Sequence, residues 1–139
     1  MIKLKLLIGG SSSFFFHLKA FSKKLNELGV ETKLVLDTDY SDGFPSRKIK
    51  NWFQTKKQFN KLIEEFQPDA IFIDREKHFG TAALEKNIPL IVLLRGHYWS
   101  ELAWYKKTIY KSFPKNIALR KWDQIAKRIF AEAEIILPI

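Results

Sequence analysis

The residues of this 139-residue chain that could do acid–base or anion chemistry cluster after short apolar runs. His78 and His97 each follow such a run, and each could act as a general base or bind an acceptor hydroxyl. His78 could equally do no more than cap the helix that follows it. Arg95 could bind phosphate through its planar guanidinium or pair with Asp74 or Glu101. These side chains can act together only if the fold brings their segments to one place.

Two glycines and three serines follow the first apolar run, residues 4–8. Glycines let the backbone approach a bulky polar group, and the start of a helix offers free N–H groups to an anion. Gly9, Gly10, Ser11 and Ser12 are therefore candidate ligand-binding residues. The same residues also fit a tight turn with helix-capping serines. The complete G-x-G-x-x-G fingerprint is absent, so no nucleotide cofactor is predicted.

Apolar segments alternate with amphipathic segments along the chain. Strands are predicted at 4–8, 30–36, 69–74, 89–94 and 134–138, and helices at 14–28 (ended by Gly29), 49–66, 80–86 (or from His78) and 123–133. Strands that are apolar almost throughout are buried on both faces, which is typical of a parallel sheet between helices. We therefore predict a single α/β domain, a Rossmann-like three-layer sandwich with a parallel sheet of about five strands.

The carboxyl ends of parallel strands meet at one edge of a sheet, where ligands bind. We expect this edge to collect four groups of residues: 9–13, Asp37, 74–78 and 95–97. No pair of candidate ligands has a recognisable metal-binding spacing, so no metal site is predicted. A Ser-His-Asp order and a G-x-S-x-G elbow are also absent.

The net charge of +9 is concentrated in two stretches. Residues 47–61 contain six basic residues and no acid, and residues 95–128 contain nine basic residues against two acids. Such surfaces suit an anionic partner, namely phospholipid headgroups, a phosphorylated substrate or nucleic acid, although a solvated face would look the same. No nucleic-acid-binding motif is present, which makes nucleic acid the least favoured partner.

Aromatic residues and lysines interleave after residue 98. Trp99, Leu102, Tyr105, Ile109 and Phe113 could share one face of a helix, flanked by lysines. This face suits an interfacial helix on an anionic membrane, or ordinary packing. The chain has no cysteine, no apolar stretch near the roughly 20 residues of a membrane span, and no signal-peptide pattern. We expect a cytoplasmic protein, with peripheral attachment to the inner face of the membrane as an option.

The order of these features resembles the N-terminal domain of group 1 glycosyltransferases, which are retaining enzymes of the two-Rossmann GT-B architecture. The matching segments are Gly9-Gly10 with its serines, Leu25–Val30, Gln67–Asp74, Asn87–His97 and Ala131–Pro138. The resemblance covers most of the chain, and its weight lies in the order of the segments. It implies that the glycine loop lies against the donor phosphates and the acceptor, and that the fourth strand presents a histidine to the reacting sugar.

Here the family's usual His-Gly is Arg95-Gly96, and His97 follows one place later. His97 is thus the candidate catalytic residue, and Asp74, His78, Arg95 and Gly96 join the glycine loop as candidate substrate-binding residues. The family's donor-binding domain, with its Glu-x7-Glu motif, is not in this sequence, which stops where the interdomain linker would begin.

The resemblance therefore implies the acceptor-side half of an enzyme that transfers a sugar from a nucleotide-sugar donor. The acceptor would be a sugar or a lipid-linked glycan, and the donor would be bound mainly by the other domain. We expect this half alone to be inactive. The alternative is a stand-alone Rossmann-like module that binds a phosphorylated ligand without catalysis.

Overall fold

Helices and strands alternate along the computed structural model, which describes residues 2–40 and 56–139. The strands are β1 (Lys5–Gly10), β2 (Glu31–Leu36), β3 (Ala70–Asp74), β4 (Leu90–Leu94) and β5 (Ile135–Pro138). The α-helices are α1 (Phe15–Glu27), α2 (Asp37–Tyr40), α3 (Lys56–Phe66), α4 (His78–Glu85), α5 (Tyr98–Lys107) and α6 (Lys115–Glu132), and a 3-10 turn, η1 (Ser12–Phe14), precedes α1. The predicted alternation is confirmed.

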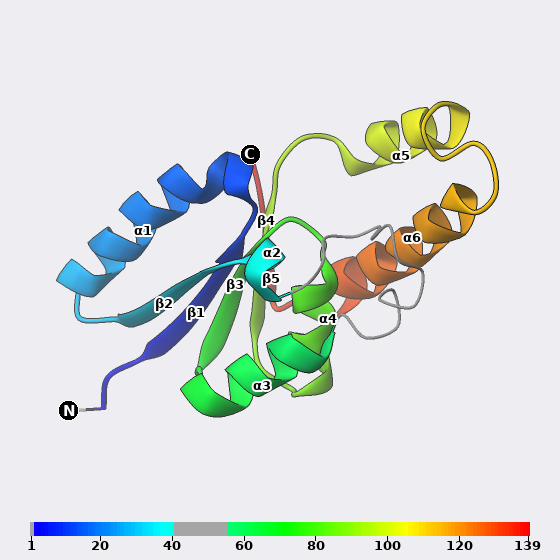
Figure 1. Cartoon of the computed structure of the whole chain (residues 1–139). Coiled ribbons are helices and arrows are strands. Elements are labelled where there is room, and N and C mark those ends of the chain that lie inside the picture. Colours follow the sequence, from blue (N-terminus) through cyan, green and yellow to red (C-terminus); the bar gives the residue numbers. More distant parts are fainter. Residues whose placement is uncertain (1, 41–55) are drawn as a thin grey trace.

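All neighbouring strands pair in parallel, in the order β2-β1-β3-β4-β5. The register places Gly10 opposite Leu36 and Asp74 opposite Leu93, so β1, β2, β3 and β4 end at the same edge of the sheet. The expected α/β class with a parallel sheet of five strands is therefore confirmed. The chain has the Rossmann-like three-layer arrangement of helix, sheet and helices (Figure 1).

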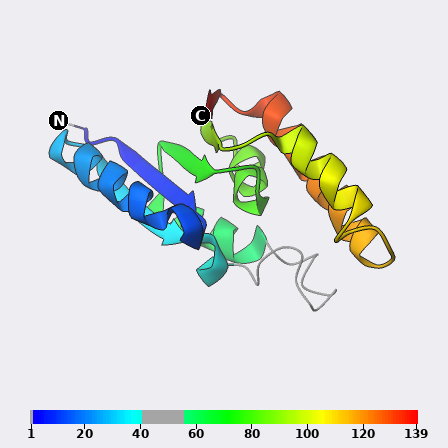
Figure 2. The same ribbon diagram turned by 90° about the horizontal axis from the view of Figure 1, so that it is seen from above.

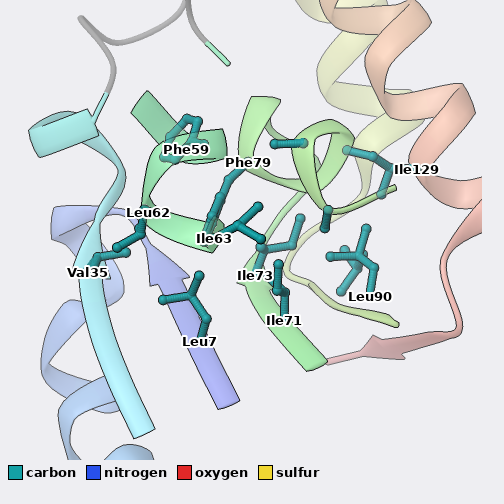
Figure 3. Packing of buried hydrophobic residues seen from close by; sticks show 13 residues of the cluster. Leu7, Val35, Phe59, Leu62, Ile63, Ile71, Ile73, Phe79, Leu90 and Ile129 are labelled. Carbon is teal, nitrogen blue, oxygen red and sulfur yellow. The ribbon is translucent and has the colours of Figure 1, made fainter. Parts of the chain in front are cut away.

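The two faces of the sheet are covered unequally. Helix α1 lies on one face, whereas α3, α4 and α6 lie on the other (Figure 2). On the α3–α4–α6 face, Phe59, Phe79 and Ile129 pack onto strand residues such as Leu7 and Ile73 (Figure 3). On the α1 face, Leu18 packs with residues of β1, β3 and β4. This burial of apolar side chains is the main force that holds the helices to the sheet.

The end of α1 follows the predicted glycine stop. Gly29 has a φ of +92°, and its N–H donates to the carbonyl of Asn26 at 3.1 Å. The next N–H, of Val30, donates to the carbonyl of Leu25 at 3.0 Å. This pair of hydrogen bonds is the Schellman motif, which favours glycine because the position requires a left-handed backbone.

Some predicted boundaries are wrong. Ile109 and Phe113 do not share a helix face with Trp99, because α5 ends at Lys107 and Thr108 has a non-helical φ and ψ of −124° and −97°. The last helix begins at Lys115 rather than at residue 123. The predicted helix over 49–66 is described from Lys56 onward, so the rest of it, and most of the basic stretch 47–61, lies outside the described residues.

No helix in the described parts of the chain is long and apolar enough to cross a bilayer.

Candidate functional site

A polar cluster occupies the carboxyl edge of the sheet on the side of α1. Asp74 ends β3, and its two carboxylate oxygens accept hydrogen bonds from Nε and Nη2 of Arg95 at 2.6 and 2.9 Å. The hydroxyl of Ser11 donates to Asp74 Oδ2 at 2.8 Å and lies 3.4 Å from Arg95 Nη2. The loops after β1, β3 and β4 therefore meet here, as the sequence predicts.

Of the roles predicted for Arg95, phosphate binding or pairing with Asp74 or Glu101, the structure shows the pair with Asp74. Asp74 is only 1% exposed, and the guanidinium and the hydroxyl of Ser11 are the partners that compensate for its burial. The guanidinium also lies 4.3 Å from the centre of the Phe14 ring, in a cation–π contact. Arg95 thus pairs with Asp74 and links the loop after β4 to β3. Because its bidentate hydrogen bonds go to a protein carboxylate, they are not available to a phosphate.

Gly9 and Gly10 are required by internal packing. Both lie inside β1 rather than in the turn after it. A Cβ on Gly9 would come within 2.3 Å of the Phe79 ring, and one on Gly10 within 2.0 Å of a methyl group of Leu18. The space above each glycine is therefore filled by a side chain of the protein. Close approach of a ligand is not needed to explain either residue.

Gly96 and His97 shape the loop between β4 and α5. Gly96 has a φ of +78°, a conformation that suits glycine. His97 is exposed and is the N-cap of α5: its Nδ1 accepts the backbone N–H of Ser100 at 3.2 Å. In the neutral ring the proton is then on Nε2. His97 thus presents an N–H donor at this atom, suited to holding a ligand oxygen rather than to taking a proton from it.

A cavity of about 230 Å³ opens at the same edge of the sheet, on the side of α3, α4 and α6. Its lining comes from α2, α3, the loop between β3 and α4, α4 itself, α5, the α5–α6 connection and α6. The polar residues are Asp37, Thr38, Arg75, Glu76, Lys77 and His78, and the rings are Phe59, Phe79, Tyr105, Tyr110 and Trp122. Carboxylates and aromatic rings thus line one partly open cavity.

Burial shifts the pKa values of an aspartate, a glutamate and a histidine in the cavity. It raises the pKa of Asp37 to about 6, against the opposing effect of Lys77, whose Nζ lies 3.9 Å from Asp37 Oδ2. Burial also raises the pKa of the Glu76 carboxyl group and lowers the pKa of His78 to about 4, with Lys56 and Lys121 adding to the second shift. The cavity therefore favours uncharged forms of its acids and of its histidine.

Glu76 is the most enclosed of these groups. It is 1% exposed, and within the described residues neither carboxylate oxygen accepts a hydrogen bond from the side chain or backbone of another residue. Its closest cation is Arg75, with 3.7 Å between Nη2 and Oε1. Arg75 also binds Glu101 of α5 and has a φ of +72°, which is unusual for a residue with a side chain. This strained loop links β3, the cavity and the first turn of α5.

The structure divides the residues predicted to gather at the sheet edge into two groups. Ser11, Asp74 and Arg95 meet on the α1 side, whereas Asp37 and His78 line the cavity on the other side. Ser12 is exposed in the 3-10 turn. His78 is the first residue of α4, whose N-cap is Lys77, so the capping interpretation of His78 is wrong.

Sequence reasoning missed the cavity. It placed residues 74–78 at the edge but gave Glu76 no role, it placed Tyr105 on an aromatic helix face, and it assigned no role to Tyr110 or Trp122. The available signal was the run Arg75-Glu76-Lys77 directly after a buried strand. No group of three or more potential metal-ligating side chains is found among the residues that the structure describes.

Fold and site together define a Rossmann-like α/β domain with a ligand-sized cavity at the carboxyl edge of its sheet. Comparison of the sequence with protein-family models and with curated proteins gave no match.

Proposed function

We propose that this chain is the acceptor-side domain of a two-domain glycosyltransferase of the GT-B type. The observation that carries the proposal is the cavity at the carboxyl edge of the sheet, whose lining combines carboxylates with aromatic rings. Parallel α/β sheets bind ligands at this edge. The order of sequence segments that resembles group 1 glycosyltransferases supports the same proposal.

The lining of the cavity suits a saccharide. A carboxylate is an acceptor, and the hydroxyl groups of a sugar can donate to Asp37 at the cavity wall. The C–H groups on the face of a sugar ring carry a partial positive charge, which the negative face of an aromatic ring attracts. Tyr105, Tyr110 and Trp122 provide such rings. The cavity volume of about 230 Å³ would hold one sugar ring and part of a second group.

The proposal assigns different tasks to the two halves of the edge. The cavity binds the acceptor, a sugar or a lipid-linked glycan. His97, through its Nε2 N–H, holds an oxygen of the reacting sugar, and the pair between Arg95 and Asp74 keeps its loop in place. The nucleotide-sugar donor is bound mainly by a second domain. A stand-alone module for phosphorylated ligands is less well supported, because the guanidinium of Arg95 is paired and the glycines are covered.

Saturation-transfer NMR with a panel of monosaccharide methyl glycosides tests the cavity. We expect transfer to at least one glycoside, and we expect Tyr110→Ala to abolish it. Trp104→Ala is the matched control, because Trp104 is a neighbouring aromatic residue that points to solvent. Equal transfer with both variants, or none with the parent chain, would contradict a saccharide site in the cavity.

Calorimetry with UDP- and GDP-sugars tests the division of labour between two domains. We expect no tight binding of these donors to this chain. Micromolar binding would show that the donor site lies in this domain.

A further inference from the structure

The connection between α5 and α6 forms an exposed apolar tip. Residues 104–117, here called the hairpin tip, comprise the end of α5, the connecting loop and the first turn of α6. Four large apolar side chains of the tip are exposed: Trp104 at 55%, Ile109 at 51%, Phe113 at 77% and Ile117 at 38%. Water contact with so much apolar surface is unfavourable, so a cluster of this kind indicates a contact surface.

The hairpin tip is also strongly basic. It contains Lys106, Lys107, Lys111 and Lys115 and no acidic residue. Among the described residues none of these four lysines forms an ion pair, whereas lysines on other surfaces do pair with carboxylates, for example Lys86 with Glu64 at 2.6 Å. The tip therefore carries four positive charges, and among the described residues only Lys106 is close enough to a carboxylate, that of Asp123, to help lower its pKa.

The position of the tip makes it accessible to a flat surface. Helices α5 and α6 lie side by side and project from the sheet, and the loop between them is at their far end (Figures 1 and 2). Tyr98 and Leu102 of α5 pack against Leu119 and Ala126 of α6, which joins the two helices below the tip. The exposed side chains are thus carried on a supported hairpin.

We propose that the hairpin tip docks on an anionic lipid bilayer. Lysines beside exposed Trp, Phe and Ile side chains match the two layers of a membrane surface: the ammonium groups reach the headgroups and the apolar side chains enter the boundary below them. A nucleic acid would satisfy the lysines and leave Ile109, Phe113 and Ile117 without a partner. The bilayer is therefore the partner that uses both features of the tip.

Exposed residues of the tip are sequence neighbours of residues that line the cavity. Trp104 and Ile109 are exposed, whereas their neighbours Tyr105 and Tyr110 line the cavity. A docked tip therefore places this wall of the cavity close to the bilayer. If the proposed function holds, the acceptor is then a glycan carried on a lipid. Docking itself does not rest on the proposed function and is tested without any sugar.

Cosedimentation with vesicles tests the docking. We expect the parent chain to sediment with phosphatidylcholine vesicles that contain about 30% phosphatidylserine, and to stay in solution with pure phosphatidylcholine. Each lysine near such a surface contributes about a fivefold change in partition. The triple change Lys106→Gln, Lys107→Gln and Lys111→Gln should therefore weaken binding roughly a hundredfold.

The control variant removes the same charge elsewhere: Lys3→Gln, Lys19→Gln and Lys23→Gln change three exposed lysines outside the tip. We expect this control to bind nearly as well as the parent. A parent chain that stays in solution with anionic vesicles, or a control that loses as much binding as the tip variant, would overturn the proposal.

The apolar half is tested by Ile109→Ser with Phe113→Ser, since both side chains are mostly exposed and carry little of the fold. Salt screens the lysines and leaves apolar insertion unaffected, so this variant should lose the binding that persists at 0.5 M salt. Fluorescence anisotropy with a single-stranded oligonucleotide completes the set. Tight oligonucleotide binding that the serine variant retains, together with no vesicle binding, would assign the tip to nucleic acid and refute docking on a bilayer.

Discussion

Replacing Gly9 by alanine separates a packing role from a ligand-binding role of the glycine pair. The new Cβ would lie 2.3 Å from Cδ1 and 2.4 Å from Cε1 of Phe79. Strand β1 is paired on both sides, with β2 and β3, so its backbone has little freedom to move away. The ring of Phe79 is 1% exposed and stacks on Phe59 with 4.6 Å between ring centres. The clash therefore has to be relieved inside a packed core.

The size of the effect follows from two opposing contributions. Overpacking of a core destabilises a protein by about 1–3 kcal/mol. Replacing glycine by alanine stabilises it by about 0.4–1 kcal/mol, because alanine restricts the unfolded chain. We expect Gly9→Ala to lower the free energy of unfolding by about 1–2 kcal/mol, which corresponds to roughly 3–10 °C in Tm. Urea unfolding followed by circular dichroism measures it.

A second substitution makes this test specific. Phe79→Leu replaces the ring by a smaller side chain, so Gly9→Ala should lower the free energy of unfolding only slightly in that background. The coupling energy between the two substitutions should be about 1 kcal/mol or more. Gly29→Ala is the control, because nothing lies within 4 Å of its Cβ and its cost comes from a φ of +92° alone. If Gly9→Ala is as stable as the parent, or costs the same with Phe79→Leu, the packing explanation is refuted and close approach of a ligand is the better one.

Two further predictions concern buried charge. Because the folded pKa of Asp37 is raised to about 6 and that of His78 lowered to about 4, the folded protein binds more protons at Asp37 and fewer at His78 between these pH values than the unfolded chain does. Compared with the parent chain, the slope of stability against pH over this window should therefore become more positive in Asp37→Asn and more negative in His78→Gln, as measured by urea unfolding at several pH values. Changes of slope with the same sign in both variants would contradict the assignment. Arg95→Met removes the cation that pairs with the buried Asp74 and should lower the free energy of unfolding by about 3 kcal/mol. Arg95→Lys keeps the charge and should lower it by about 1 kcal/mol. Equal losses of stability in chemical denaturation would show that the ion pair is not what stabilises the loop.

The sheet could be predicted from the sequence because its signals are local. Apolar strands such as residues 90–94 alternate with amphipathic helices, and a glycine at residue 29 ends α1 by a defined hydrogen-bond motif. The convergence of Ser11, Asp74 and Arg95 followed from parallel strands alone. These inferences need periodicity and topology but no knowledge of side-chain contacts.

The cavity and the role of the glycines could not be predicted in the same way. Asp74 and Glu76 are two residues apart, yet one faces the α1 side and the other the cavity, since the loop turns at Arg75 with a positive φ. The packing of Phe79 over Gly9 joins residues that are distant in sequence. The outward Trp104 beside the inward Tyr105 depends on how α5 packs against α6, which the stripe of aromatic residues does not specify.

The order of the strands has a consequence for how the chain can be assembled. Strand β2 adds to one side of β1, and β3, β4 and β5 then add to the other side in the order in which they are synthesised. Each of these three strands joins the outer edge formed by the one before it. None of the strands that the structure describes has to be inserted between two that are already paired. The sheet can therefore grow outward from β1 during translation, without dissolving any pairing already made.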